Sequence, residues 1–480
     1  MTEPTSPTHS PLRPAGAYRR YHIDTAEARD IAAWPTRFQV QVSRVGLARW
    51  LVKEMLEQRG DLDVVLSRPC MYGVFSGPVG GFAPRPELCV GCLRCTTQHP
   101  DFVEIRHNPA RQALGDSYFT FQAVDAISYE ARLGSIPVKG AGYRGRFGGA
   151  GWDGMWTDMS EIVRPTRDGI HGREFISTVV DIGTKPGYLR FGSDGLVETA
   201  VPHTFSLPLP ILFDAPPAAL LRGPAGGVLP RVLADAAAAV QTLALLPLDV
   251  MRARGLSGAH LAPLLTAADV PHVASLSFEP RLVVLEAWQP ALVDEVRFCF
   301  PEAVLALRRP FGDAAGLLAD YERGARVFWL TADYHGRGED GRFVIDLIRA
   351  AHGAFVRAGV REEVTLLGGG GIIAAEHVPK AIILGLDAVV LDTPLLVALQ
   401  ATFDGEFAHR QQVNITLPPN LPADWGVQRL KNLTAAWRDQ LLEILGAMGL
   451  REVRRLRGEI GRAMFAQDLE REAFAGIDGY

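Results

Sequence analysis

The cysteines are the residues whose spacing points most directly to chemistry. Three of the five cysteines in the 480-residue chain, Cys89, Cys92 and Cys95, stand three positions apart in the run CVGCLRCTTQHP. A C-x2-C-x2-C loop turns three thiolates toward one centre, which is the geometry that a cubane iron–sulfur cluster requires. Cys70 is the only nearby cysteine that can supply a fourth ligand. The spacing therefore predicts a [4Fe–4S] cluster bound by Cys70, Cys89, Cys92 and Cys95.

Other ligand sets remain open for this triplet. The bacterial ferredoxin run C-x2-C-x2-C-x3-C-P has a cysteine where this chain has His99, followed by Pro100. His99 as the fourth ligand, or a three-iron cluster on the triplet, is therefore an alternative. A structural zinc site also uses four cysteines, although usually as two separated C-x2-C pairs. Cys299 stands among apolar residues and is expected to be a small buried side chain.

Glycines and a threonine form a second group of candidates. Four consecutive glycines follow the apolar stretch VTLL, and Thr393 follows the apolar stretch AVVLD. Glycines let backbone N–H groups approach a phosphate, and a threonine hydroxyl is a further donor. Glycines also end strands for steric reasons, so the run has a structural explanation as well. The glycines are Gly368, Gly369, Gly370 and Gly371.

Charged residues follow two further apolar stretches. Arg308 follows AVLAL, and Asp333 and His335 follow VFWLT. A cation such as Arg308 stabilises negative charge in a reduced flavin ring, or forms a salt bridge at a barrel rim. A histidine transfers protons near neutral pH, so His335 is a candidate catalytic residue together with Asp333.

A third charged segment precedes the regular part of the chain. Within residues 158–174, two close arginines and a histidine would suit a carboxylate or phosphate, or would belong to a solvated linker. These candidates for substrate binding are Arg164, Arg167 and His171.

A repeating pattern of strands and helices from residue 208 would position these candidates. Strand-like apolar runs are expected at 210–216, 241–249, 272–279, 281–288, 303–311, 327–336, 364–372 and 388–396. Most are separated by helix-like segments, which predicts a (β/α)8 barrel. Loops after the seventh and eighth strands of such barrels often bind a phosphate, so the glycines and Thr393 favour FMN. The third and fourth runs are too close for an intervening helix, so an open doubly wound sheet remains the alternative.

The chain divides into five expected parts. They are a disordered tail (1–35), a cysteine-rich iron–sulfur module (36–130), a bridging segment (131–207), the FMN-binding barrel (208–405) and a C-terminal helical extension (406–480). One apolar helix face is expected in the extension, and a second, highly charged helix should follow at 451–474. The residues of that face are Leu430, Leu433, Trp437, Leu441 and Leu445.

Composition narrows the class of protein. Hydrophobic residues make up 48% of the chain, charged residues 21%, and the net charge is −5, so neither nucleic acid nor an anionic membrane is indicated as a partner. The chain begins without the apolar core of a signal peptide, and no run of about 20 apolar residues could span a bilayer. We expect a cytoplasmic protein, in which cysteines bind metals more often than they form disulfides. The charged C-terminal helices are compatible with a homo-oligomer.

The residues at the phosphate-binding end and after it resemble a known family. The stretches GGGGIIAAEHVPKAIILGLDAVVLDTPLLVAL and LLEILGAMGLREVRRLRGEIGRAMF look like the FMN-binding domain of glutamate synthase. The segments SEIVRPTRDGIHGRE and STVVDIGTKPGYLRF look like the entry to that domain. The chain is most similar to short glutamate synthase-related proteins without a glutaminase domain, over residues 130–470.

The resemblance implies cofactors and partners. It implies FMN, an iron–sulfur cluster, and a ferredoxin or a reductase subunit as the electron partner. It assigns the strand-seven glycines and Thr393 to the FMN phosphate, and it puts Arg308 where the family has a lysine near the flavin. The Gly-rich segments usual after strands four and six are replaced by EAWQPALVDEV and DYHGRGED.

The sequence as a whole predicts an FMN- and iron–sulfur-dependent oxidoreductase. Its expected substrate is an amino acid, a keto acid or a similar small polar molecule, with a CH–NH2 group as the expected donor. The alternative is a non-catalytic or electron-transfer subunit of a larger complex, with a structural metal site. The expected substrate and proton-transfer residues are His335, Asp333, His171, Arg164 and Arg167.

Overall fold

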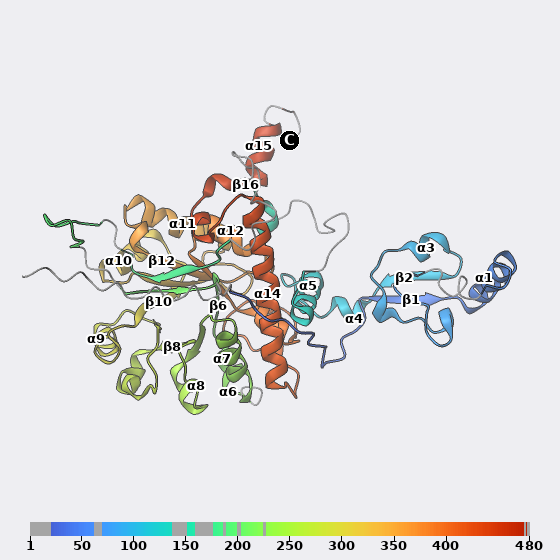
Figure 1. The fold of residues 1–480 in the computed structure, drawn as a ribbon, viewed down its shortest axis with the longest axis horizontal. Coiled ribbons are helices and arrows are strands. Elements are labelled where there is room, and N and C mark those ends of the chain that lie inside the picture. The colour runs from blue at the N-terminus through green and yellow to red at the C-terminus, as the bar shows by residue number, and fades with distance from the viewer. Residues whose placement is uncertain are drawn as a thin grey trace, which may run out of the picture.

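The largest part of the protein is a closed barrel of eight parallel strands (Figure 1). The computed structural model describes residues 21–61, 70–136, 151–158, 176–185, 189–198, 203–223, 227–474 and 477. The strands follow one another around the barrel in chain order, which confirms the predicted (β/α)8 barrel and excludes the open sheet. They are β6 (Ile211–Phe213), β7 (Ala244–Pro247), β8 (Leu261–Leu265), β9 (Leu282–Leu285), β10 (Val304–Pro310), β11 (Val327–Thr331), β12 (Thr365–Gly369) and β13 (Ala388–Leu391).

Helices connect these strands and cover the barrel. Phe328 on β11 meets Phe355 of α11 with ring centroids 5.2 Å apart, so alternation along the strand turns Trp329 into the barrel interior. Burial on both sides explains why the strands are continuous apolar runs. No helix in the described part of the chain is both long and apolar enough to cross a membrane. The connecting elements are α6 (Ala218–Arg222), α7 (Leu229–Ala239), α8 (Leu248–Ala253), η6 (Ala267–Ser275), α9 (Pro290–Cys299), α10 (Ala314–Glu322), α11 (Val344–Arg357), η7 (Arg361–Glu363), α12 (His377–Ile383) and α13 (Thr393–Ala398).

The third strand lies earlier than expected. The prediction of a strand at 272–279 is wrong, because the third strand is β8 and the first half of that range belongs to the 3-10 helix η6. Thr266 and Asp269 form a capping box that begins η6. Pro271 inside η6 would remove a ladder hydrogen bond from a central strand. With β8 at its true position there is room for η6 before β9.

Residues 21–35 form a strap against the helices around the barrel. The Tyr21 hydroxyl donates to the carbonyl oxygen of Val240 at 2.6 Å, and the Ile31 N–H donates to Gln400 Oε1 at 2.8 Å. Trp425 Nε1 donates to the carbonyl oxygen of Arg29 at 2.7 Å. Residues 1–20 of the expected tail lie outside the described residues.

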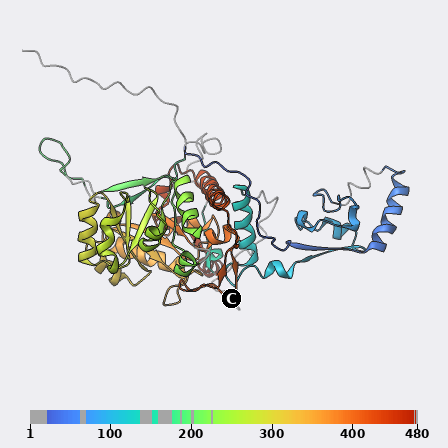
Figure 2. The same ribbon diagram turned by 90° about the horizontal axis from the view of Figure 1, so that it is seen from below.

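Residues 36–108, here called the cysteine module, form a small unit that projects from the barrel (Figures 1 and 2). Strand β1 (Phe38–Val42) pairs antiparallel with β2 (Val103–His107), and the module has a hydrophobic core separate from the barrel core. The module was expected to reach residue 130, but α5 (Phe121–Leu133) packs against α13 and α14. The remaining elements here are α1 (Arg44–Glu57), η1 (Gly80–Phe82), η2 (Pro86–Leu88), α3 (Arg94–Gln98) and α4 (Pro109–Gln112).

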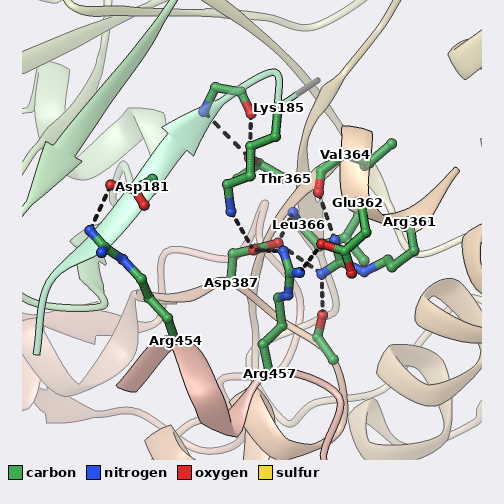
Figure 3. A network of polar contacts seen from close by, with 12 residues as sticks. Asp181, Lys185, Arg361, Glu362, Val364, Thr365, Leu366, Asp387, Arg454 and Arg457 are labelled. Carbon is green, nitrogen blue, oxygen red and sulfur yellow. Dashed lines mark hydrogen bonds and ion pairs between the residues drawn. The ribbon is translucent and has the colours of Figure 1, made fainter. Parts of the chain in front are cut away.

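An ionic network closes the N-terminal face of the barrel (Figure 3). Asp387, just before β13, accepts hydrogen bonds from Arg361 at 2.8 Å, Arg457 at 3.0 Å and the N–H of Leu366 at 2.8 Å. Lys185, after β4 (Val180–Gly183), lies 3.7 Å from Asp387. The network therefore joins the hairpin of β4 and β5 (Thr204–Leu207), the barrel and the C-terminal segment.

One long helix, α14 (Ala423–Ala447), dominates the C-terminal extension. Its expected apolar face is confirmed, since Leu430, Leu433, Trp437, Leu441 and Leu445 are all fully buried. The second helix was predicted too long. Gly458, with φ +73°, interrupts that segment. It forms η8 (Val453–Leu456), η9 (Ile460–Arg462), β16 (Ala463–Phe465) and α15 (Ala466–Phe474), and β16 pairs with β3 (Met155–Thr157), which follows η3 (Gly151–Gly154).

Candidate active site and metal centre

Charged side chains gather at the carboxyl ends of the barrel strands, where (β/α)8 barrels bind their ligands. Asp214 directly follows β6, Arg308 lies on β10, and Asp392 directly follows β13. Arg410 comes from the loop between β14 (Thr402–Phe403) and β15 (Ile415–Thr416). We call these four residues the mouth network.

Arg410 holds the mouth network together. Its Nη1 donates to Asp214 Oδ2 at 2.6 Å, its Nη2 to Asp392 Oδ2 at 2.9 Å, and its Nε to the carbonyl oxygen of Ala332 at 2.7 Å. Arg308 Nη2 lies 3.4 Å from Asp214 Oδ1. Two carboxylates therefore face two guanidinium groups, and the charges of the network balance.

Burial and pairing set the protonation of this network. Burial raises the pKa of Asp392 to about 6. The positive charge of Arg410 opposes this rise, and the negative charge of Asp214 adds to it. Burial also acts to lower the pKa of Arg410, but the two carboxylates outweigh it and hold that pKa above its usual value. Asp392 is therefore the member of the network whose charge changes in mildly acidic solution.

The four predicted phosphate-binding glycines lead β12 into a tight turn. Gly370 and Gly371 have φ angles of +107° and +70°. A Cβ on Gly370 would lie 2.6 Å from the carbonyl oxygen of Asp333, and one on Gly369 would lie 2.5 Å from that of Val390. On Gly368 it would lie 2.8 Å from Leu386. Close packing within the chain is therefore enough to explain why these positions are occupied by glycine.

Two aromatic residues from before the barrel bind this turn. The Tyr118 hydroxyl donates to the carbonyl oxygen of Gly371 at 2.6 Å, and Trp152 Nε1 donates to the same oxygen at 2.8 Å. Trp152 also stacks on His377 of α12, with ring centroids 4.9 Å apart. Tyr118 and Trp152 therefore cover the turn on the side where the Gly371 carbonyl oxygen lies.

Two donor groups at the mouth fit a phosphorylated flavin. Thr393 Oγ1 and Arg308 Nε are both buried and have no hydrogen-bond partner among the described residues. Such atoms are rare in folded proteins, and a phosphate or flavin oxygen would satisfy them. Asp392 opposes this fit, because its carboxylate accepts the Thr393 N–H at 2.6 Å, at the start of α13. FMN would therefore be held by Thr393, Arg308 and the glycine turn, with the Asp392 charge partly neutralised by Arg410.

His335 forms a hydrogen-bonded pair with Asp116. The distance from His335 Nε2 to Asp116 Oδ2 is 2.8 Å, and the imidazole stacks on Tyr118 with ring centroids 5.3 Å apart. Burial acts to lower the pKa of His335, but the hydrogen bond and charge of Asp116 outweigh it and raise that pKa. The imidazole can therefore hold a proton near neutral pH.

The same pair has a third acidic neighbour. Glu406 Oε2 lies 3.9 Å from His335 Nε2, so Asp116, His335 and Glu406 together resemble a donor set for a divalent cation. The Asp116 carboxylate, however, already accepts the N–H groups of Phe119 at 2.6 Å and Phe407 at 3.1 Å. Its hydrogen-bonding capacity is satisfied by the chain, which favours a role in positioning His335.

Asp333 closes the turn that carries His335. Its carboxylate accepts the N–H of Arg337 at 2.6 Å, and its own N–H donates to the carbonyl oxygen of Arg337 at 2.8 Å. The other expected substrate residues, Arg164, Arg167 and His171, lie outside the described residues.

The four expected cluster ligands act on one another electrostatically. Burial raises the pKa of Cys89, and charges on Cys70 and Cys92 add to the rise. Burial likewise raises the pKa of Cys95, with contributions from Cys70 and Cys89. Cys89 and Cys95 are buried in the core of the module, Cys70 packs against that core, and Cys92 is exposed.

The loop also offers hydrogen bonds to these sulfurs. The N–H groups of Gly91 and Thr96 bond to Cys89 and Cys95 and act to lower their pKa values. Such bonds to sulfur stabilise and tune cluster-bound thiolates. The residues thus fit an iron–sulfur cluster.

His99 has neighbours of another kind. Its ring stacks on Phe102 and meets the edge of Trp50, with centroids 5.1 Å from each. These contacts make His99 part of the module's packing and favour Cys70 as the fourth ligand.

Several residues of the site were not expected from the sequence. Asp214 and Asp392 had a usable signal, since each directly follows an apolar run recognised as a strand. Arg410, Asp116 and Tyr118 come from loops without a local pattern, so only the folded chain reveals them. Asp116 and Tyr118 stand more than 200 residues before His335 and Gly371.

Comparison with known proteins connects part of this face to one family. Residues 337–450 match the family model described as the conserved region in glutamate synthase. That range covers the glycine turn, Thr393 and Arg410.

Two curated relatives and one solved structure show the extent of the similarity. An archaeal-type glutamate synthase [NADPH] of Dehalococcoides mccartyi is 23% identical over 444 residues, covering 78% of this chain and 86% of its own. An archaeal glutamate synthase [NADPH] of Archaeoglobus fulgidus is 36% identical over 130 residues, which is 25% of each chain. A mandelate oxidase variant solved with (S)-mandelic acid has a TM-score of 0.40 and 15% identity, covering 72% of this chain and 91% of its own.

Proposed function

We infer that the chain is a glutamate synthase-related protein, and on this premise we propose that it is an FMN- and iron–sulfur-dependent oxidoreductase. Its proposed substrate is an amino acid, a keto acid or a similar small polar molecule, with oxidation at a CH–NH2 group. The observation that carries the proposal is the buried Thr393 hydroxyl without a partner, at the end of β13 in the shared segment. FMN, when bound, supplies hydride transfer.

The chain's own residues have distinct proposed roles. Thr393 Oγ1 and the backbone of Gly370 and Gly371 bind the phosphate, together with the neighbouring Gly368 and Gly369. Arg308 binds an anionic edge of the flavin or a substrate carboxylate through its unpaired Nε. His335, positioned by Asp116 and the Asp333 turn, holds a proton at Nε2 toward Asp116 and is proposed to exchange a proton with the substrate at its other ring nitrogen, Nδ1. Arg164, Arg167 and His171 are proposed to bind a substrate carboxylate.

The cysteine module is proposed to carry electrons. Cys70, Cys89, Cys92 and Cys95 would bind a [4Fe–4S] cluster, which exchanges single electrons with a ferredoxin or a reductase subunit. We place the protein in the cytoplasm, where thiolates remain available to a cluster.

A cofactor count on the anaerobically purified protein tests the proposal. About four irons and one FMN per chain are expected, with flavin bands above a broad cluster absorption. Cys92→Ser should lose the iron, whereas Cys299→Ser, which changes a cysteine of α9, should retain it. Iron-free protein with bound zinc would contradict the cluster.

A threonine variant tests the flavin site. Thr393→Val keeps the shape of the side chain and removes the hydroxyl, so the Kd for FMN should rise by about tenfold, as for a lost hydrogen bond to a charged group. Thr434→Val is the matched control, because that buried hydroxyl bonds the Leu430 carbonyl within α14. Equal FMN affinity in wild type and Thr393→Val would rule out the proposed role of Thr393.

The second candidate is a non-catalytic or electron-transfer subunit with a structural metal site. The balanced charges of the mouth network and the tight packing of the glycine turn favour it, since neither feature needs a ligand. A stable, flavin-free protein whose unfolding midpoint is unaffected by added FMN would support this candidate.

A further inference from the structure

The cysteine module exposes an unusual amount of apolar surface. About half of the exposed large apolar side chains in the described residues lie between positions 45 and 93, far above the scattered single residues usual on a monomer. They occur on α1 and around the cysteine loop: Val45, Val52, Met55, Leu56, Met71, Tyr72, Val79, Phe82, Leu88, Val90 and Leu93. A standard interface buries roughly 800 Å2 on each partner, and apolar side chains exposed in this number can supply a large share of such an area.

Helix α1 has two apolar faces. Its inner face packs on the module, where Leu47 is buried and Gly46 lies so close to Phe102 that a Cβ would be 2.5 Å away. Its outer face carries Val45, Val52 and Leu56, of which Val45 is 81% and Leu56 77% exposed. A helix that is apolar on both sides normally packs between two partners.

The outer stripe has the spacing of a helix-packing seam. Val45, Ala48, Val52 and Met55 follow one another at intervals of three, four and three residues, as in positions a and d of a heptad. A second helix would complete this seam by packing its own side chains between them.

Nothing in the described part of the chain covers this stripe. The cysteine module has its own core, and α1 lies at the end of the module that is remote from the barrel (Figures 1 and 2). The described chain enters and leaves the module beside the barrel, at residues 36 and 108. The outer face of α1 is therefore left uncovered by the part of the chain that the structure describes.

Charge along α1 indicates which partner fits. Arg44 and Arg49 stand in the N-terminal half of the helix. The C-terminal half carries Glu54 and Glu57 with a single cation, Lys53, which lies 3.8 Å from Glu57. In an antiparallel pair of identical helices, the basic half of each lies beside the acidic end of the other, and the helix dipoles also oppose. The helix is thus complementary to itself, as a two-fold symmetric contact requires.

We propose that the outer face of α1 binds a second copy of this chain, α1 against α1 in antiparallel orientation, to form a symmetric dimer through the cysteine modules. The apolar side chains near the cysteine loop extend the contact. The proposal concerns a surface and does not depend on the cofactors.

Sedimentation of the full chain tests the proposal. Wild type should be dimeric at concentrations of about 10 µM and above, as a contact of this size permits. Val52→Lys with Leu56→Lys should raise the dimer Kd by at least about tenfold, because two charges would enter the seam. Phe298→Lys is the matched control, since Phe298 is 85% exposed on α9 and lies outside the module; it should leave the dimer unchanged. All variants should retain the wild-type circular dichroism spectrum.

Charge reversal separates a second copy from a different partner. Arg44→Glu and Glu57→Arg should each weaken the dimer, and the two together should restore it, because the proposed antiparallel pair puts Arg44 of one helix beside Glu57 of the other. A wild-type chain that stays monomeric at about 100 µM would overturn the proposal and leave the surface to another protein. A dimer that survives the double lysine change would overturn it as well.

Discussion

Two histidines at opposite ends of the barrel have pKa values that are shifted in opposite directions. At the mouth, Asp116 outweighs burial and raises the pKa of His335. At the N-terminal face, burial and the charge of Arg361 lower the pKa of His352 to about 4. Arg361 Nε donates to His352 Nδ1 at 3.1 Å, which requires that nitrogen to be unprotonated. One histidine is thus available for proton transfer, and the other is a neutral part of the packing.

Replacing Asp116 with asparagine should lower the pKa of His335. The native pair stabilises the fold below the usual histidine pKa, and this contribution is lost as pH rises through the raised value. Asp116→Asn should therefore reduce the free energy of unfolding at pH 5.5 by about 1–2 kcal/mol, and by less at pH 8. NMR titration of the imidazole together with urea unfolding at both pH values measures this. An unchanged His335 pKa would contradict the pairing.

His352 predicts the opposite pH dependence. Its folded-state pKa lies below the unfolded value of 6.5, so protonation favours the unfolded chain between pH 6.5 and about 4. As the pH falls from 6.5 to about 4, protonation of His352 alone should lower the free energy of unfolding by on the order of 2 kcal/mol. His352→Gln should flatten that part of the profile. An equally steep loss in the variant would assign the effect to other groups.

At the scale of elements, the turn after β12 is fixed by packing from several directions. Gly370 approaches the strand end of β11, while Gly371 offers its carbonyl to Tyr118 and Trp152. The turn therefore keeps its shape without any ligand, and the strand it ends is one wall of the mouth.

An alanine at Gly370 should destabilise the chain strongly. Its Cβ would meet the Asp333 carbonyl oxygen at 2.6 Å, and its φ of +107° is unsuited to side chains. We expect a loss of about 3 kcal/mol, because backbone cannot move aside cheaply. Gly359→Ala is the matched control, with φ +72° and open space around its Cβ, and should cost about 1 kcal/mol. Both losses of stability are measured by urea unfolding of the flavin-free chain. Equal losses in the two variants would show that the close packing around Gly370 does not contribute to stability.

The sequence predicted elements well where local pattern decides them. Seven of the eight expected barrel strands overlap the observed ones, because buried parallel strands are continuous apolar runs. The third was missed because β8 has Pro263 within it, while residues 272–279 alternate like a strand. The capping box at Thr266 and Asp269 was the signal that would have corrected this.

The candidate site was less accessible to sequence reasoning. His335, Thr393 and Arg308 were found because each stands at a strand end. The groups that orient them, Asp116 and Arg410, come from distant loops, and only tertiary contacts define them. Charge pairing of this kind leaves no periodicity in the sequence.

At the scale of the whole molecule, buried polar side chains of α14 hold the strap in place. Arg429 is fully buried and donates to the carbonyl oxygens of Ala398 at 2.5 Å and Ala28 at 3.1 Å. It also bonds Asp30 at 2.8 Å and Ser128 Oγ at 3.1 Å. A single guanidinium therefore connects the strap, α5 and the end of α13.

Removing that guanidinium should release the strap. Arg429→Met leaves several buried acceptors without a donor, so the chain should lose roughly 2–4 kcal/mol of stability. Amide hydrogen exchange should rise in residues 21–35 before it rises in the barrel strands. Arg231→Met is the control, because it removes an exposed arginine paired with Asp235 on α7; it should leave both the stability and the exchange of the strap unchanged. Unaltered exchange in the strap of Arg429→Met would contradict this account.

Residues 453–465, which cover the N-terminal face of the barrel, follow all eight barrel strands in the sequence, and this order affects folding during synthesis. Arg457 completes the network around Asp387, and β16 pairs with β3 across about 300 residues of sequence. A ribosome delivers β6 to β13 first, so the nascent barrel keeps an open, charged N-terminal face until residues 453–465 have emerged. The nascent barrel therefore keeps this face uncovered while the segment between β13 and η8 is being synthesised, and the uncovered charged groups are exposed to non-native contacts during that interval.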